Sequence, residues 1–398
     1  MQGDSDMNLV QQENLGYYVV NNVKYASKIA ACVDATRLNK PVTWVFNDHV
    51  LNAVDWTKEP EESLQTLYSK RAREIREKYD YVVISYSGGA DSTNIVQTFL
   101  DNNLFIDEIL VNTFERALGS TVDHNMRNTS PENYSAEHKL QIYPRLEEIR
   151  LRSPLTKINV TDLSGFLFKS ILTKDTSPEW VLTHREVLNP SGVARYNYIH
   201  DTQVRRRFDK TLSACIVVGV EKPITYIKPN TTEYRLMFAD GAVNLTPVDS
   251  HFTEYDNTSV EYFYWHPTTM RLVAKQAHVV KRWLEANPQY HDLFTFTSGR
   301  AFRDSLKFRH ELLRMVLYDN WNPNWFQATK GRMDWFASID DWFQKLYGNT
   351  EHGQAWFRGI EFVRKNAAPY IEGHGFKPFI KDFYVGEMKK PQILKEAK

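Results

Sequence analysis

The stretch YVVISYSGGADS, residues 81–92, decides the fold class of this 398-residue chain. Its first half, Tyr81–Tyr86, is an uncharged run of β-forming residues, which predicts a buried central strand. Two adjacent glycines follow, and the apolar spacing of residues 91–100 then predicts a helix. A strand, a glycine turn and a helix in direct succession are typical of an α/β protein.

The glycine turn has the residue types of an anion-binding loop. Gly88 and Gly89 let the backbone turn sharply and approach an anion without a Cβ in the way. The successive backbone N–H groups, with that of Ala90 among them, form a nest for the anion. The positive end of the helix dipole lies at the same place. We therefore expect these three residues to contact a phosphate.

Three side chains of the same turn add polar groups. Ser87 and Ser92 can donate hydroxyl hydrogen bonds to phosphate oxygens. Asp91 carries a charge that repels phosphate, so we expect it either to cap the helix or to hold Mg²⁺ indirectly.

Strands and helices continue to alternate along the chain. Further strands are expected at residues 108–113, 155–160 and 214–219, with helices at residues 60–80, 91–100 and 135–151. This alternation predicts an α/β fold with a doubly wound, mainly parallel sheet, whose ligands bind at the carboxyl ends of the strands.

The same reading divides the chain into three parts. Residues 1–58 are expected to form a small N-terminal cap, and residues 59–222 the nucleotide-binding domain. Residues 223–398 are expected to form a β-hairpin followed by a mostly helical accessory or substrate-binding region.

The six residues Ser87–Ser92 match the SGGxDS signature of the PP-loop ATP pyrophosphatases. That superfamily includes phosphoadenosine phosphosulfate reductase and the deazaguanine nitrile synthase of queuosine biosynthesis. The resemblance covers about residues 80–222. It implies an adenine nucleotide α-hydrolase-like fold, ATP and Mg²⁺ as ligands, and cleavage of ATP to AMP and pyrophosphate to adenylylate a substrate. It also implies catalytic roles for Ser87 and Asp91.

Two other nucleotide-binding or hydrolytic motifs do not fit the glycine turn. The GxxxxGK[ST] motif of P-loop NTPases is absent, and the turn is not the GxSxG of serine hydrolases.

Two more segments resemble parts of the same superfamily. Gly219 and Lys222 lie where the reductase branch carries a Gly-x-Arg/Lys segment, which implies that Gly219 binds nucleotide and that Lys222 has a catalytic role. The alternative is an ordinary strand exit with a solvated lysine. Thr113 and Phe114 lie where the superfamily contacts adenine through backbone groups. The alternative there is an ordinary β–α loop.

Composition separates the branches of the superfamily. The chain has only Cys32 and Cys215, so a cysteine-bound metal and sulfur-transfer chemistry are disfavoured, and no metal-ligand residues are assigned. Lysine plus arginine and aspartate plus glutamate both number 49, which leaves only a local patch such as Arg205–Arg207 for contact with nucleic acid.

These observations favour an ATP-dependent enzyme that adenylylates a small molecule for amide or C–N bond formation. Two alternatives stay open: a PP-loop enzyme that modifies a nucleotide or nucleic-acid base, and a non-catalytic nucleotide-binding protein. No signal peptide and no apolar run of about 20 residues is present, so we expect a cytoplasmic protein without membrane contact. The sequence does not specify the oligomeric state.

Overall fold

The computed structural model describes most of the α/β core and parts of the regions around it. The described residues are 16–118, 134–165, 177–183, 212–219, 223–240, 258–295, 309, 311–319, 321–322, 341–373 and 375–388. Lys222 and Arg205–Arg207 lie outside these ranges.

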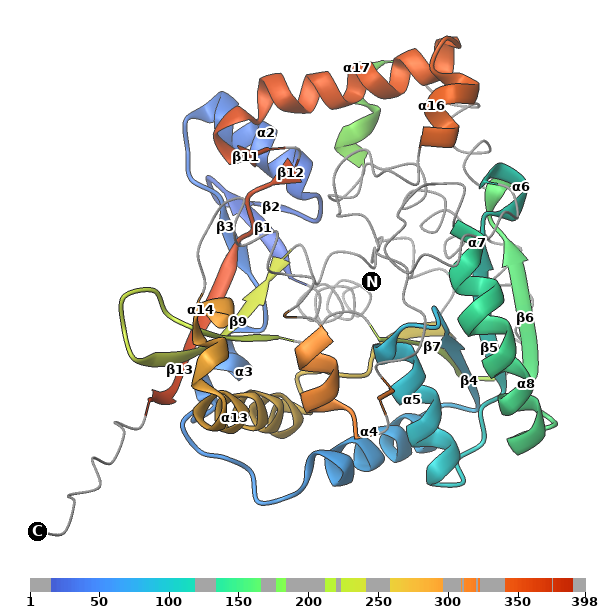
Figure 1. Ribbon diagram of the computed structural model, residues 1–398. Coiled ribbons are helices and arrows are strands. Elements are labelled where there is room, and N and C mark those ends of the chain that lie inside the picture. Colours follow the sequence, from blue (N-terminus) through green and yellow to red (C-terminus); the bar gives the residue numbers. More distant parts are fainter. Residues whose placement is uncertain are drawn as a thin grey trace, which may run out of the picture.

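A five-stranded parallel sheet is the central element (Figure 1). Its strands are β4 (Tyr81–Ser85), β5 (Glu108–Thr113), β6 (Lys157–Asp162), β7 (Ala214–Val218) and β10 (Thr258–Tyr262). They follow the spatial order β10-β7-β4-β5-β6, so the order reverses between β4 and β7. The predicted α/β fold with a mainly parallel sheet is thereby confirmed, and four of these strands were expected.

The fifth strand, β10, was not predicted. It pairs in parallel with β7 over its whole length, from Thr258 opposite Ala214 to Tyr262 opposite Val218. The sheet therefore extends into the segment after residue 222 that was assigned to the accessory region. Its sequence, TSVEY, has a glutamate at the fourth position and lacks the apolar run that identified the other strands.

The structure describes five helical segments between β4 and β6. They are α5 (Ala90–Asp101), α6 (Glu115–Leu118), α7 (Tyr134–Glu137), a π-helical turn η2 (His138–Ile142) and α8 (Tyr143–Arg152). Figure 1 shows α5 and α8 side by side, and residues of both line one small cavity. In α5, Ile95, Val96 and Phe99 are buried, and Leu100 is half-buried.

Helix α4 (Leu64–Lys78) precedes the sheet and is joined to β10 by a buried ion network. Glu261 of β10 is 3% exposed, and its carboxylate accepts from Arg71 at 2.7 Å and from Lys78 at 2.8 Å. The Tyr79 hydroxyl donates to the same carboxylate. Arg71 also donates to the carbonyl of Tyr262 at 2.9 Å, so the network fixes both the side chain and the end of the strand.

This network predicts a pH-dependent contribution to stability. Burial by itself would raise the pKa of Glu261, but the Arg71 charge and two hydrogen bonds outweigh it and lower the pKa to about 2. Since the unfolded value is 4.5, ionised Glu261 stabilises the folded chain above that pH, and the effect is lost as the pH falls toward 2.

We expect Glu261→Gln to lower the free energy of unfolding by roughly 2 kcal/mol at neutral pH. The difference from the unsubstituted chain should shrink as the pH falls below 4.5. Urea unfolding of both chains at several pH values measures it. A difference that does not change with pH would show that the Glu261 charge contributes nothing.

The N-terminal segment contains a small antiparallel sheet. Its strands β2 (Val23–Tyr25), β1 (Tyr17–Val20) and β3 (Thr43–Val45) pair in that order, with helix α2 (Lys28–Leu38) between β2 and β3 in the chain and helix α3 (Asp48–Ala53) after β3.

A second antiparallel sheet contains the predicted hairpin. Strands β8 (Ile224–Ile227) and β9 (Glu233–Ala239) pair as expected, and β13 (Ile380–Glu387) adds to the other edge of β9. β13 was not predicted, because its pairing partners lie 141 to 154 residues earlier in the chain. Figure 1 shows β9, β13 and α13 on the side of the molecule opposite α5 and α8.

The described residues from 270 to 376 are mostly helical. Their elements are α13 (Met270–Ala286), η5 (Pro288–Tyr290), α14 (His291–Phe294), α16 (Asp341–Tyr347), α17 (Glu351–Asn366), η7 (Ala368–Tyr370) and the short strands β11 (Ile371–Glu372) and β12 (Gly375–Phe376). Helix α17 packs against α2 and the 3-10 helix η3 (Pro178–Thr183), where the rings of Trp180 and Trp356 lie 4.9 Å apart. None of the helices in the described part of the chain has the length and apolarity needed to span a bilayer.

Candidate functional site

The glycine turn connects β4 directly to α5, as the sequence predicted. β4 ends at Ser85, and α5 begins at Ala90 with Gly89 as its N-cap residue. Gly88 has a φ of +71°, in the left-handed region that favours glycine. Gly89 has an ordinary extended conformation, with φ −71° and ψ 168°. The positive φ of Gly88 is therefore what turns the chain from the strand into the helix.

Glycine is also required at position 88 because a side chain would not fit there. A Cβ at this position would lie 2.4 Å from Cγ1 of Ile142, which belongs to the π-helical turn η2. Such turns interrupt helices and often occur at functional sites. Gly88 thus meets two independent constraints, one on its backbone conformation and one on its packing.

The two serines of the turn are hydrogen-bonded to each other and to its backbone. The Ser87 N–H donates to Oγ of Ser92 at 3.2 Å, and the two hydroxyl oxygens lie 3.3 Å apart. The Ser92 hydroxyl donates to the carbonyl of Gly89 at 3.2 Å. Ser87 is exposed and Ser92 is buried. Of the two, Ser87 has the hydroxyl that an incoming ligand can reach.

Asp91 does not cap the helix, contrary to one of the two roles expected for it. Gly89 is the N-cap residue, and Asp91 lies in the first turn of α5. Its Oδ1 accepts a hydrogen bond from the hydroxyl of Tyr318, and its carbonyl accepts one from the hydroxyl of Tyr264 at 2.7 Å. A carboxylate in the first turn is favourable for the helix dipole, so no N-cap role is needed to explain it.

Gly219 lies next to the glycine turn. It follows β7, and a Cβ on Gly219 would lie 3.2 Å from Cβ of Asp91 and 3.2 Å from the backbone nitrogen of Ser92. The sequence placed Gly219 near the nucleotide only by resemblance, and the structure brings it against the first turn of α5. Lys222, its expected partner, lies outside the described residues.

Thr113 and Phe114 lie at the same edge of the sheet, at the end of β5. Both are buried, with Phe114 at 0% exposure. The carbonyl of Thr113 accepts a hydrogen bond from the backbone of Leu163 at 2.8 Å. The carbonyl of Asn112 is in contact with Nε2 of His138 at 3.2 Å. The backbone carbonyls at the end of β5 are therefore bound to the residue that follows β6 and to η2.

The carboxyl edge of the sheet thus brings most of the predicted site residues together. The described members are Ser87, Gly88, Gly89, Ala90, Asp91, Ser92, Thr113, Phe114 and Gly219, all within or directly after β4, β5 and β7. Sequence reasoning missed Ile142, Tyr264 and Tyr318. No motif marks them, although the aromatic run Tyr262–Trp265 could have drawn attention to Tyr264.

Neither of the two cysteines is accessible to solvent. Cys32 and Cys215 are both fully buried, in α2 and β7, and burial raises the pKa of the Cys215 thiol. A buried thiol with a raised pKa is a poor nucleophile and a poor metal ligand. Within the described ranges, His, Cys, Asp and Glu side chains nowhere gather in a group of three that could hold a metal ion.

The chain matches no protein-family model, and a search of curated proteins finds no match for it. A functional interpretation therefore rests on residues 87–92 and on the geometry around them.

Proposed function

We propose that the chain is an ATP pyrophosphatase of the PP-loop type, with a doubly wound sheet. The observation that carries this is the SGGxDS turn, with its left-handed glycine, between a buried parallel strand and a helix N-terminus. The turn also lies where the strand order reverses, between β4 and β7. In open α/β sheets ligands bind outside the carboxyl ends of the strands at such a reversal.

In this proposal the turn binds the triphosphate of ATP. The backbone N–H groups of Gly88, Gly89 and Ala90 and the hydroxyl of Ser87 donate to phosphate oxygens, while the buried Ser92 hydroxyl, predicted to do the same, holds the turn through the Gly89 carbonyl. Adenine lies toward Thr113 and Phe114 at the end of β5, on the other side of the turn from Gly219.

Charge neutralisation accompanies phosphate binding. Asp91, in the first turn of α5, is the carboxylate that would hold Mg²⁺, and the bound ion would reduce the negative charge on the departing pyrophosphate. Lys222 contributes a second positive charge to the phosphates. Both act by positioning and charge rather than by covalent chemistry.

The proposed reaction has two steps. An oxygen of the substrate attacks the α-phosphorus of ATP, the bond between this phosphorus and the bridging oxygen to the β-phosphate breaks, and pyrophosphate leaves. An amine or ammonia then attacks the activated carbon, and AMP leaves with the original substrate oxygen. The product is an amide or another C–N bond on a small molecule.

Buried thiols support this chemistry over sulfur transfer. The chain has two cysteines in total, and both are fully buried. A persulfide carrier or a thiolate nucleophile has to be reachable by its substrate, and neither residue meets that condition.

Product analysis tests the proposal. Incubation of the chain with ATP, Mg²⁺ and a fractionated metabolite extract should release AMP and pyrophosphate in equal amounts, and a Gly88→Val variant should release neither. ADP as the sole nucleotide product would contradict the proposal. ATP binding without turnover would favour the non-catalytic alternative. Salt-sensitive binding to tRNA or DNA, with turnover only in its presence, would favour base modification.

A further inference from the structure

Two tyrosines from distant parts of the chain hold the first turn of α5. The Tyr318 hydroxyl donates to Oδ1 of Asp91 across 227 residues of sequence, and the Tyr264 hydroxyl donates to the Asp91 carbonyl at 2.7 Å across 173 residues. Asn94, one turn further along the helix, donates to the Tyr264 hydroxyl at 3.0 Å. Side chain and backbone of Asp91 are thus each bound to a phenol.

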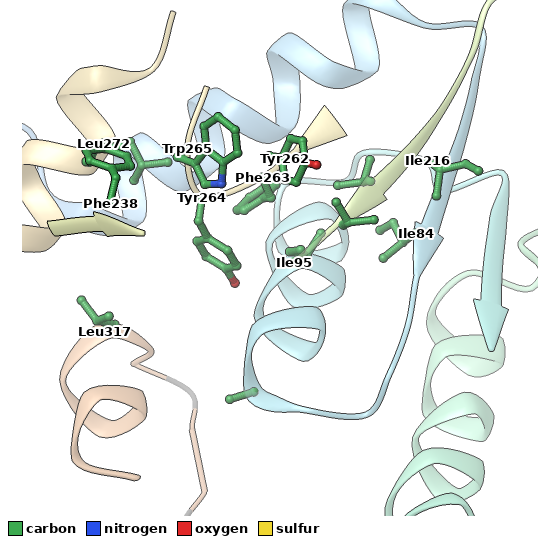
Figure 2. Close-up of a cluster of buried hydrophobic side chains, with 14 of the residues drawn as sticks. Ile84, Ile95, Ile216, Phe238, Tyr262, Phe263, Tyr264, Trp265, Leu272 and Leu317 are labelled. Carbon is green, nitrogen blue, oxygen red and sulfur yellow. The ribbon is translucent and has the colours of Figure 1, made fainter. Parts of the chain in front are cut away.

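Packing fixes the positions of both phenols. Tyr264 is 0% and Tyr318 3% exposed, and their ring centroids lie 5.8 Å apart. Tyr68 of α4 packs against both rings, at 5.6 Å and 6.3 Å. Figure 2 shows the Tyr264 ring between the helix that carries Ile95 and the segment that carries Leu317. The orientation of the two hydroxyl groups is therefore set by the core and not by solvent.

The Tyr318 hydroxyl donates to the Asp91 carboxylate from a ring that is itself held in the core. A phenol that donates to one carboxylate oxygen holds the carboxylate in one orientation. A fixed orientation favours metal binding, because the other oxygen does not have to be ordered when the ion binds.

We propose that Tyr318 is a positioning residue of the nucleotide site, which orients the Asp91 carboxylate for Mg²⁺ while Tyr264 fixes the backbone of the same turn. This inference rests on the proposed function, since it takes Asp91 to hold the metal ion. Partners that orient a metal-binding carboxylate affect metal affinity strongly. The segment 311–319, which the sequence assigned to the accessory or substrate-binding region, is then part of the nucleotide site.

Calorimetric titration of Mg²⁺ in the presence of ATP, on the full chain, tests this role. Tyr318→Phe removes the hydroxyl and keeps the ring, and should raise the half-saturating Mg²⁺ concentration about tenfold. Tyr68→Phe is the matched control. Its hydroxyl belongs to the same buried cluster but lies 3.5 Å from the carbonyl of Leu317 and has no hydrogen bond to Asp91, so the Mg²⁺ requirement should stay within twofold.

A double-mutant cycle separates positioning from a loss of stability. In an Asp91→Asn background, which already lacks the charge that binds the metal, adding Tyr318→Phe should change the Mg²⁺ requirement less than twofold. Independent, multiplying effects of the two substitutions would overturn the inference, as would equal effects of Tyr318→Phe and Tyr68→Phe. Failure of the unsubstituted chain to bind ATP would instead overturn the proposed function and this inference together.

Discussion

Substitution of Gly88 by valine is expected to abolish ATP binding, with an affinity loss of at least about 100-fold. The residue has a φ of +71°, which costs a side-chain-bearing residue about 1–2 kcal/mol. A Cβ at this position would also lie 2.4 Å from Cγ1 of Ile142, so either the turn or η2 has to move. Because the donors that bind phosphate are backbone N–H groups of this turn, any shift misdirects several of them at once.

Gly359 offers a matched control for the steric part of this change. A Cβ on Gly359 would lie 2.4 Å from Nε1 of Trp180, the same distance as at Gly88, but in α17 and away from the turn. Gly359→Ala should therefore lower stability and leave the ATP dissociation constant unchanged.

Substitution of Gly89 tests the approach of the ligand to the backbone without changing the conformation of the turn. The φ of −71° at Gly89 suits any residue, so Gly89→Ala should fold normally and weaken ATP binding only through its methyl group. Calorimetric titration of the folded fraction measures all three variants. Unchanged affinity in Gly88→Val would remove the turn from the binding site.

The second large effect is expected at the ion pair that joins the N-terminal segment to the antiparallel sheet of β8, β9 and β13. Nζ of Lys28 lies 2.8 Å from Oδ2 of Asp240, and both side chains are 0% exposed. The same carboxylate accepts from the Tyr18 hydroxyl at 2.9 Å and from the backbone N–H of Phe379 at 2.8 Å. A single residue of the chain after β9 thereby connects α2, β1 and the entry to β13.

Lys28→Met is expected to lower the free energy of unfolding by about 3–5 kcal/mol, because it leaves the Asp240 charge buried without its cation. Adding Asp240→Asn should recover part of that loss, since the double variant buries neither charge. Chemical denaturation measures the unfolding free energy of each chain.

Lys381→Met is the matched control for this prediction. Nζ of Lys381 lies 2.6 Å from Oδ1 of Asp48 and likewise joins β13 to the cap, but the two side chains are 21% and 39% exposed. The control should cost less than about 1 kcal/mol. If Lys28→Met is no more costly than Lys381→Met, the buried pair does not connect the two units as described.

Local sequence patterns predicted the elements that local interactions determine. The apolar run Tyr81–Tyr86, the glycine turn and the helix after it are contiguous, and the structure has them at the expected residues. Strand β10 was missed because Glu261 interrupts its apolar pattern. This glutamate is tolerated because Arg71 and Lys78 of α4, which lie 190 and 183 residues away in the sequence, bind its carboxylate. Strand β13 was missed for a related reason, since its pairing partners in β9 lie 141 to 154 residues earlier in the chain.

The candidate site shows the same division. The residue types of the turn indicated an anion site, because the requirement for glycine and for backbone donors is local. One of the two roles predicted for Asp91 was wrong, because Gly89 is the N-cap residue of α5. The hydrogen bond from Tyr318 to the Asp91 carboxylate could not be predicted, because Tyr318 lies 227 residues away in the sequence. The packing of Ile142 against Gly88 depends on the π-helical turn, which no spacing of apolar residues predicted.

The most direct test of the central claim is a crystal structure of the chain with Mg²⁺ and a non-cleavable ATP analogue carrying a methylene group between the α- and β-phosphates. The account predicts the β- and γ-phosphates against the backbone N–H groups of residues 88–92, adenine beside Thr113 and Phe114, and the metal ion on the side of Asp91. A nucleotide bound elsewhere on the chain, with residues 87–92 free of phosphate, would contradict it.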